Sequence, residues 1–468
     1  MISDLVIFGA TGDVAKRYVF PALSHLVSHG RLPNGLTIIG VGRRPWTTPQ
    51  FQEYVSEVLG THRPSIPPDS RLELLPFLKY HQVKDLKSPA HLKRIFSHSL
   101  GACIMYLGLP PCLFGSVLTA LEDVKIPKAS RIILEKPFGL SYAEAEALNR
   151  ILDKRFSEES IFRMDHFLGK PTVENILNLR FEKQPFERIW QRQYINKVEI
   201  VWDETLALEG RGAYYDRAGA LKDMVQNHLL QMMVLLTMEP APLESERAFR
   251  DQRVELLRSI RKMSMTDIQK FTLRARYRSG TIGGKDIPDY VSEEGVVPER
   301  ETETFARVTL RIDNARWQNV PFVLQSGKAM EKDTKEIRIL FQKTPLGILT
   351  PELAEPPNLL RFNLENETID LEFSPRKGQG GGHTIPLALN GSMPPSDLPP
   401  YARLFLEVLS GNPTRFIRND EAEEMWKVVQ PIVDGWQEGW VPLQHYRAGS
   451  NGPRATKGPI KAYHGMPT

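Results

Sequence analysis

The sequence predicts an α/β Rossmann-like N-terminal domain followed by an α+β C-terminal domain with a large, mainly antiparallel sheet. Three observations support this prediction. With 468 residues the chain is too long for one ordinary core. Short apolar runs alternate with helical patterns in the first third of the chain, whereas strand-like runs follow one another without helices later on. We place the domain boundary so that the two domains span residues 1–165 and 166–468.

The alternation near the start of the chain predicts a parallel sheet covered by helices on both faces. The run "DLVIFG" reads as a buried strand, and apolar residues then recur at helical spacing from Val14 to Val27. Further strands are predicted for "LTIIGVG", "ACIMYLGLP" and "SRIILEKP". Helix-like stretches separate these runs, as parallel strands require.

After about residue 170 the pattern changes. Helices are predicted for "ENILNLRFE" and "LKDMVQNHLLQMMVLLTM". Strands are predicted for "INKVEIVWDE", "ETFARVTLRID", "VPFVLQSG", "KEIRILFQ", "LLRFNLEN" and "TIDLEFS". Consecutive strands joined by turns favour an antiparallel sheet. The segments "KGQGGGH" and "SMPPSDLPP" predict loops, and the tail from "RAGSNGP" onward has too few apolar residues to be tightly packed.

The composition is that of an ordinary globular protein, 41% hydrophobic and 25% charged. A net charge of +4 is small for this length, so we expect no nucleic-acid partner, although local basic pockets for small anions are compatible with it. Cys103 and Cys112 have neither metal-ligand spacing nor a disulfide framework, so we expect reduced structural thiols and no metal. No secretory signal and no apolar run of ~20 residues is found, and we expect a soluble cytoplasmic protein without a membrane partner.

The segment "VIFGATGDVAK" places Gly9, Thr11, Gly12 and Asp13 between a predicted strand and a predicted helix. Glycines there allow a close approach of a pyrophosphate to the backbone, and the start of a helix offers free N–H groups. A tight strand-to-helix turn without a ligand would also explain the glycines. The position at the start of an alternating pattern favours a dinucleotide.

The second predicted strand ends in "GVGRR", with Arg43 and Arg44 and no acid. A site for NAD usually has Asp or Glu there, whereas a site for NADP offers arginine to the 2′-phosphate. The alternative is two solvated surface arginines. The sequence therefore favours NADP, with NAD as a weaker alternative.

Seven motifs in order resemble those of the glucose-6-phosphate dehydrogenase family. They are "GATGDVAKR", "YLGLPP", "LEKPFG", "RMDHFLGK", "EGRGAYYD", "KDMVQNHLLQ" and "VPFVLQSGK". The resemblance covers essentially the whole chain. It implies NADP-dependent oxidation of glucose 6-phosphate at C1 to the 1,5-lactone, and a homodimer or homotetramer formed through the large sheet. The chain stops soon after "GSNGP", so we expect one cofactor site per chain.

The resemblance implies a catalytic pair. Hydride leaves C1 only as the C1 hydroxyl proton is removed, so the site needs a base that titrates near neutral pH. His228 occupies the position of that base in the family, and Asp165 would hold its imidazole by the other nitrogen. Without the resemblance, a lone histidine in an apolar helix would more often be a hydrogen-bonded core residue.

The resemblance also implies the substrate ligands. His166 and Lys170 correspond to ligands of the substrate phosphate, and their spacing of four residues would place them on one helical face. Lys136 matches a lysine that contacts both substrate and cofactor. The residues that align with ligands of the sugar hydroxyls are Glu204, Asp223 and Lys328. Read without the resemblance, these residues are as compatible with solvated helix edges or helix capping.

Two positions depart from the family pattern. The family has a tyrosine where this chain has Phe167, so a hydroxyl donor to the phosphate is missing, worth about ten- to hundredfold in affinity. The family arginine in "VPFVLQSGK" is Gln325, and Asp333 follows in a segment where relatives carry cations. Compensation by neighbouring residues would explain these departures, and so would a dehydrogenase of a modified sugar or sugar phosphate, such as an amino-sugar 6-phosphate. A separate alternative is a non-catalytic NADP-binding regulator that kept the fold.

Overall fold

The computed structural model describes residues 2–62, 71–97, 99–182, 184–241, 245–342, 358–373, 387–392 and 397–453. The chain forms two compact units. The first consists of Met1–Lys170, Pro242–Arg250 and Ser396–Glu423, and the second consists of Pro171–Ala241, Asp251–Pro395 and Glu424–Thr468. The predicted division at residue 165 assumed one continuous segment per domain, whereas the first unit also includes two later segments. The predicted loop "KGQGGGH", part of "SMPPSDLPP" and most of the tail lie outside the described residues.

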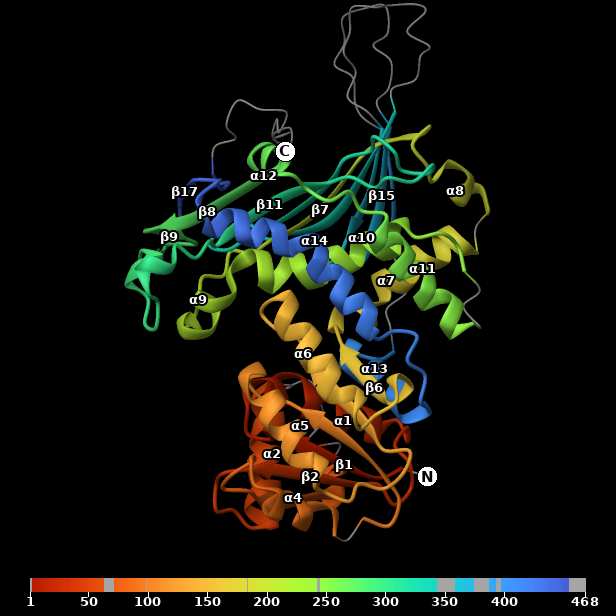
Figure 1. Ribbon diagram of the computed structural model, residues 1–468, viewed down its shortest axis with the longest axis vertical. Helices are drawn as coiled ribbons and strands as arrows, with labels where there is room; N and C mark the ends of the chain where they lie inside the picture. The colour runs from red at the N-terminus through yellow and green to blue at the C-terminus, as the bar shows by residue number, and fades with distance from the viewer. Residues whose placement is uncertain are drawn as a thin grey trace, which may run out of the picture. The chain divides into compact units, whose positions relative to one another are not determined.

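The first unit contains a six-stranded sheet in the order β3-β2-β1-β4-β5-β6, and every neighbouring pair is parallel (Figure 1). Its strands are β1 (Ile2–Phe8), β2 (Thr37–Gly42), β3 (Leu78–Gln82), β4 (Ala102–Leu107), β5 (Arg131–Glu135) and β6 (Ile161–Met164). The predicted parallel sheet is confirmed, with its four predicted strands. The sequence analysis missed β3, where Lys79 and His81 interrupt the apolar residues, and the four-residue β6.

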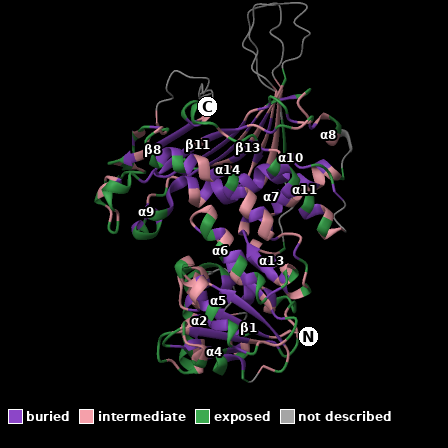
Figure 2. Ribbon diagram, viewed as in Figure 1, coloured by how far each residue is buried: buried purple, intermediate pink, exposed green. Residues whose placement is uncertain are grey.

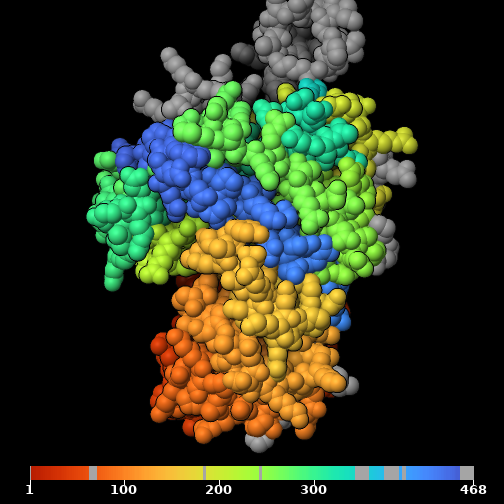
Figure 3. Space-filling view, in the orientation of Figure 1, coloured from red at the N-terminus to blue at the C-terminus, as the bar shows by residue number. Residues whose placement is uncertain are grey.

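Helices separate the strands of the first unit, as predicted. They are η1 (Ala15–Val19), α1 (Phe20–Ser28), α2 (Thr48–His62), η2 (Leu75–Phe77), α4 (Pro89–Phe96), η3 (Pro111–Leu113), α5 (Phe114–Glu122), α6 (Tyr142–Asp153), η4 (Glu158–Ser160), η5 (His166–Gly169) and α13 (Pro400–Ser410). On the face shown in Figure 3, the surface of this unit comes mainly from the orange segment around α5 and α6. The η1 segment is wound as a π-helix, and the others named η in this unit are short 3₁₀ turns.

The core of the first unit lies against the central strands. The last five residues of β1 are buried, as expected for a strand covered on both faces (Figure 2). Phe20 and Phe51 meet edge to face with ring centroids 5.9 Å apart. A Cβ on Gly40 would lie 2.3 Å from the Phe51 ring, so only glycine allows α2 to pack this closely on β2. The later segment contributes Leu404 from α13 to the same core, and each such buried side chain stabilises the fold by about 1.5–3 kcal/mol.

The second unit contains a nine-stranded sheet in the order β16-β15-β14-β13-β7-β12-β11-β8-β17. Its strands are β7 (Ile195–Asp203), β8 (Thr272–Arg278), β11 (Phe305–Leu310), β12 (Phe322–Gly327), β13 (Thr334–Phe341), β14 (Leu359–Asn363), β15 (Thr368–Phe373), β16 (Leu387–Ser392) and β17 (Leu443–Arg447). Among these described strands, the β7–β12 and β8–β17 pairs are parallel and the other neighbours are antiparallel. The predicted large, mainly antiparallel sheet is confirmed. A separate hairpin joins β9 (Gly280–Ile282) to β10 (Lys285–Ile287).

The helices of the second unit include both predicted ones. They are α7 (Pro171–Phe181), α8 (Gln184–Ile189), α9 (Gly212–Ala220), η6 (Leu221–Leu229), α10 (Leu230–Thr237), α11 (Glu246–Arg258), α12 (Met265–Phe271), η7 (Tyr290–Ser292), η8 (Pro298–Arg300) and α14 (Asn419–Gln437), of which α11 and α14 begin in residues of the first unit. The η6 segment packs against β7, β11 and β12. Within the described ranges, no helix combines the length and apolar character that a membrane span needs.

Candidate functional site

The glycine turn after β1 lies where the strand order of the first unit reverses. Gly9 has a φ of +77°, and a Cβ on it would lie 2.2 Å from the carbonyl oxygen of Gly108 on the neighbouring strand end. The Gly12 N–H donates to the Gly9 carbonyl at 2.8 Å, which closes the turn. Asp13 forms an exposed ion pair with Arg17 at 2.9 Å. The bare backbone of this turn suits close approach of a dinucleotide pyrophosphate.

The two arginines at the end of β2 have a fixed backbone and exposed side chains. The Arg43 carbonyl accepts a hydrogen bond from Gln82 at 3.1 Å, and the Arg44 carbonyl accepts one from the Tyr80 hydroxyl at 2.9 Å. The Arg44 guanidinium lies 4.7 Å from the centroid of the Trp46 ring. The chain therefore presents two positive charges at the carboxyl edge of the sheet, where dinucleotides bind in such folds.

Lys136 and Asp165 leave neighbouring strands at this same edge, because Glu135 and Met164 pair in register on β5 and β6. Lys136 is half-buried and its peptide bond to Pro137 is cis. Asp165 is fully buried, and its carboxylate accepts the Phe167 N–H at 2.9 Å. This hydrogen bond caps the short η5 turn.

His166 and Lys170 do not share a helical face, so that prediction is wrong. His166 to Gly169 form one 3₁₀ turn, and Lys170 already has extended backbone angles. The physical reason is Pro171, whose ring disfavours the α conformation in the residue before it. Both side chains still approach Phe167. The Lys170 amino group lies 5.0 Å from the Phe167 ring centroid, and the His166 ring lies 4.9 Å from it.

An aromatic cluster that the sequence analysis did not find surrounds His166. Its ring is nearly parallel to the rings of Tyr401 and Tyr18, at centroid distances of 5.8 Å and 6.3 Å. The two tyrosine rings stack on each other at 5.1 Å with an interplanar angle of 10°. Tyr401 comes from α13, far along the chain and outside every motif, so no sequence signal connected it to the site.

Glu135 is a second residue that the sequence analysis missed. It is buried beside Lys136, and the Tyr106 hydroxyl donates to its carboxylate at 2.7 Å. Burial, and then the charge of Glu135, raise the pKa of Tyr401, so this phenol also lies near the carboxyl group. Burial raises the pKa of Glu135 to about 7, although the two phenols and the charge of Lys136 act in the opposite direction. The carboxyl group therefore titrates near neutral pH.

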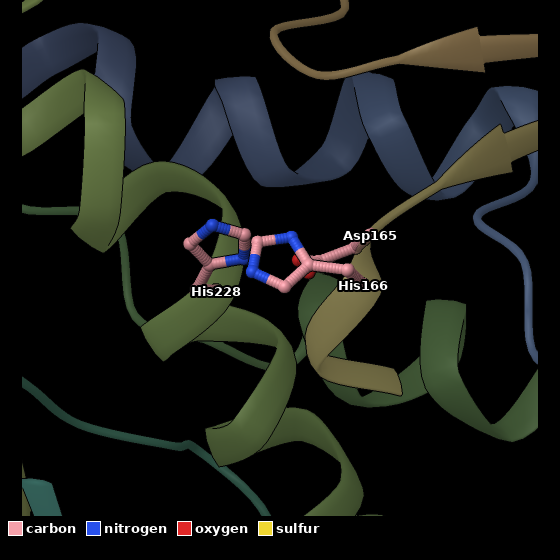
Figure 4. A group of neighbouring side chains, drawn as sticks. All are labelled: Asp165, His166 and His228. Carbon is pink, nitrogen blue, oxygen red and sulfur yellow. The ribbon is translucent and has the colours of Figure 1, made fainter. Parts of the chain in front are cut away.

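In the second unit, η6 carries His228 and Asp223 (Figure 4 shows His228 on this helix, and Asp165 and His166 where β6 ends). A turn at Gly219, with a φ of +67°, precedes the helix, and the Glu303 carboxylate accepts the Leu221 N–H at 2.9 Å. His228 is 1% exposed. The Tyr214 hydroxyl donates to Asp223 at 3.3 Å.

Glu204 and Lys328 lie together in the second unit. The Lys328 amino group is 2.7 Å from the Glu204 carboxylate and 5.4 Å from the centroid of the Tyr215 ring. β7 and β12 run parallel, so residues that follow them emerge at the same end of the sheet. This partly buried pair of a carboxylate and an ammonium can accept from and donate to the hydroxyl groups of a sugar.

Comparison with known proteins identifies the family. Residues 6–175 match the family model "Glucose-6-phosphate dehydrogenase, NAD binding domain", and residues 177–464 match "Glucose-6-phosphate dehydrogenase, C-terminal domain". The chain belongs to the glucose-6-phosphate dehydrogenase family. Residues 6–175 of this family member therefore form a nicotinamide-dinucleotide-binding domain.

Individual relatives agree along nearly the whole length. A glucose-6-phosphate 1-dehydrogenase from Treponema pallidum (strain Nichols) is 36% identical over 479 residues, covering 98% of this chain and 93% of the relative. The enzyme of the same name from Bacillus subtilis (strain 168) is 32% identical, covering 96% and 95%. A solved structure described as glucose-6-phosphate dehydrogenase in complex with its substrate glucose-6-phosphate is 30% identical with a TM-score of 0.86, covering 97% of this chain and 96% of that chain.

The structure shows what each residue that departs from the family pattern contacts. Phe167 is 3% exposed and serves as the apolar surface under Lys170. Gln325 lies on β12, donates to Asp203 at 2.6 Å and accepts from Arg307 at 2.7 Å. Burial raises the pKa of Asp203 to about 7, although the Gln325 hydrogen bond and the charge of Arg307 oppose this. Asp333 accepts the Thr205 N–H at 2.6 Å, which holds the loop after Glu204.

The raised pKa of Glu135 gives a pH dependence of stability. The folded protein holds this proton more tightly than the unfolded chain, so the free energy of unfolding falls as pH rises from 4.5 to about 7. Glu135→Gln removes this loss. We expect the variant to gain on the order of 3 kcal/mol relative to the wild type across this interval, measured by urea unfolding at a series of pH values.

A second variant tests whether Glu135 causes this pH dependence of stability. Tyr106→Phe removes a donor that stabilises the carboxylate, so it should shift the dependence to higher pH. Parallel pH profiles for the wild type and Glu135→Gln would show that Glu135 does not titrate in this interval.

Proposed function

We propose that this protein oxidises glucose 6-phosphate at C1 to 6-phosphoglucono-1,5-lactone, with NADP as the hydride acceptor. The observation that carries the proposal is the full-length match to a glucose-6-phosphate dehydrogenase whose structure holds glucose 6-phosphate. The side chains that the family pattern assigns to the reaction are kept at the matching positions, apart from the phosphate tyrosine and the arginine at position 325. A regulator without catalysis would have no need of a base.

His228 removes the proton from the C1 hydroxyl group. Oxidation of C1 forms a C=O bond from the C1 hydroxyl, so the hydroxyl proton must leave as the C1–H bond breaks. When bound, the nicotinamide ring accepts the hydride. His228 takes the proton as general base, a contribution of roughly 10²–10⁴ in rate. Asp165 orients the imidazole and stabilises its protonated form, a role that its buried, capped carboxylate suits.

The remaining site residues bind and orient the substrate. His166 and Lys170, both close to the Phe167 ring, hold the phosphate dianion by charge-assisted hydrogen bonds. Lys136 contacts the substrate and the cofactor. Glu204, Lys328 and Asp223 hold the sugar hydroxyls, for which the Glu204–Lys328 pair offers both a donor and acceptors.

NADP is held by the glycine turn and by the arginines that follow β2. Gly9, Thr11, Gly12 and Asp13 form the turn against the pyrophosphate. Arg43 and Arg44 bind the 2′-phosphate, which NAD lacks. The exposed side chains and the fixed main chain of both arginines support this role.

The test of the activity is the appearance of reduced nicotinamide, followed by its near-ultraviolet absorbance, with glucose 6-phosphate, glucose and amino-sugar 6-phosphates side by side. We expect the fastest turnover with glucose 6-phosphate. If only another sugar is oxidised and glucose 6-phosphate is not, the protein is a dehydrogenase of that modified substrate. His228→Asn should reduce turnover by roughly 10²-fold or more while NADP binding is kept. If no substrate is oxidised and His228→Asn changes nothing measurable, the regulator alternative holds.

The cofactor assignment is tested by the double variant Arg43→Ala with Arg44→Ala. Loss of two charged donors should weaken NADP binding by about ten- to hundredfold or more and NAD binding by far less. Calorimetric titration with each dinucleotide measures the two affinities. Arg31→Ala, at an exposed position after α1, is the control for a general loss of charge. Equal losses of affinity for NADP and NAD would contradict the assignment of these arginines to the 2′-phosphate.

We further propose that two copies assemble through the charged face of the large sheet, defined by Glu199, Arg307, Glu336, Arg338, Arg361 and Glu372. Arg361 contacts Glu336 at 3.2 Å and Glu372 at 2.9 Å, and Arg338 pairs with Glu199 at 3.5 Å. The opposite face carries the buried apolar residues Val198, Ile200 and Ile337. A surface with both charges at regular spacing can be complementary to itself.

Light scattering should give a mass of two or four chains for the wild type. Arg361→Glu places a third carboxylate beside Glu336 and Glu372 and should shift the equilibrium toward single chains. Arg150→Glu, on a 70% exposed side chain of α6, should leave the mass unchanged. A single-chain mass for the wild type at micromolar concentration would contradict the assembly.

A further inference from the structure

Tyr18 lies near His166, one of the proposed phosphate ligands, within the first unit. It belongs to η1, the π-helical segment that follows the glycine turn. Its ring stacks on Tyr401 at 5.1 Å and lies nearly parallel to the His166 ring at 6.3 Å. These two contacts fix the plane of the phenol next to the imidazole. Short π-helical insertions of this kind occur frequently at functional sites.

The three aromatic residues near His166 differ in whether they can offer a hydroxyl. Phe167 has none. Tyr401 is buried, and its phenol lies near the Glu135 carboxyl group. Tyr18 is 46% exposed. Over the part of the chain that the structure describes, no hydrogen bond joins the Tyr18 hydroxyl to another protein group, so its proton can be donated to a ligand.

We propose that the Tyr18 hydroxyl donates the hydrogen bond to the substrate phosphate that Phe167 cannot supply. The inference rests on the proposed function, because it assumes that His166 and Lys170 hold that phosphate. Its ligand class is a phosphate monoester dianion. In this chain the hydroxyl donor comes from Tyr18 on η1 and not from position 167 on η5. The stack with Tyr401 keeps Tyr18 near His166.

The arrangement is chemically consistent with this role. An O–H donor to a phosphate oxygen forms a short, charge-assisted hydrogen bond that is about twice as strong as a neutral one. Stacking on Tyr401 restricts the ring of Tyr18 before the ligand binds, so less side-chain entropy is lost on binding. Tyr401 is itself buried, so the ring on which Tyr18 stacks belongs to the packed interior of the unit.

The test is Tyr18→Phe, which keeps the stacked ring and removes only the hydroxyl. The KM for glucose 6-phosphate and the inhibition constant of inorganic phosphate should both rise about tenfold or more, while kcat changes much less. Tyr194→Phe is the matched control, because Tyr194 is a comparably exposed tyrosine of the second unit, at 47%. It should change neither constant.

A second-site variant separates a hydrogen bond from a packing effect. Adding Phe167→Tyr to Tyr18→Phe restores a hydroxyl beside Lys170 and should recover most of the lost affinity for phosphate. If Tyr18→Phe leaves both constants at their wild-type values, the inference is wrong. A wild type that oxidises no sugar phosphate would refute the proposed function instead. A rise in KM without a rise in the inhibition constant of phosphate would likewise overturn the assignment of Tyr18 to the phosphate.

Discussion

The close approach of two backbones at the centre of the first sheet is the constraint on which the rest of the site depends. Gly9 and Gly108 pass so near each other that no side chain fits at Gly9. This contact brings the ends of β1 and β4 together at the point where the strand order reverses. Since all six strands are parallel, the residues that directly follow β2, β5 and β6 lie at the same edge of the sheet. The two arginines after β2, Lys136 and Asp165 lie at a common edge because of this parallel arrangement.

Buried carboxyl groups support the polar side chains in both units. In the first unit, Glu135 at the end of β5 accepts a hydrogen bond from Tyr106 and lies near Tyr401, whose ring is nearly parallel to that of His166. In the second, Asp203 precedes Glu204 on the chain and is held by Gln325. Burial raises both pKa values to about 7, so each group exchanges its proton in the range where a histidine base works. An arginine at position 325 would stabilise the charged form of Asp203, whereas a glutamine only donates a neutral hydrogen bond.

The sequence predicted those features that depend on local patterns. Continuous apolar runs identified the central strands, and the arginines after β2 were found because they follow a recognisable strand. The winding of particular turns was not predictable. Lys170 lies outside the 3₁₀ turn because of Pro171, and η1 and η6 adopt π-helical winding that apolar spacing does not distinguish from α-helix. Tyr18, Tyr401 and Glu135 were missed since their relation is one of packing between distant segments. The spacing of residues along the chain does not predict such contacts.

The return of residues 396–423 to the first unit has a consequence for biosynthesis. Leu404, Phe405 and Phe416 belong to the core that β1 and β2 begin, yet they leave the ribosome after most of the second unit. Domains generally fold as they are synthesised, from the N-terminus onward. Here the first sheet can form early, but part of its apolar surface stays uncovered until about nine tenths of the chain has been made. The nascent first unit is therefore the stage at which the protein depends most on protection from aggregation.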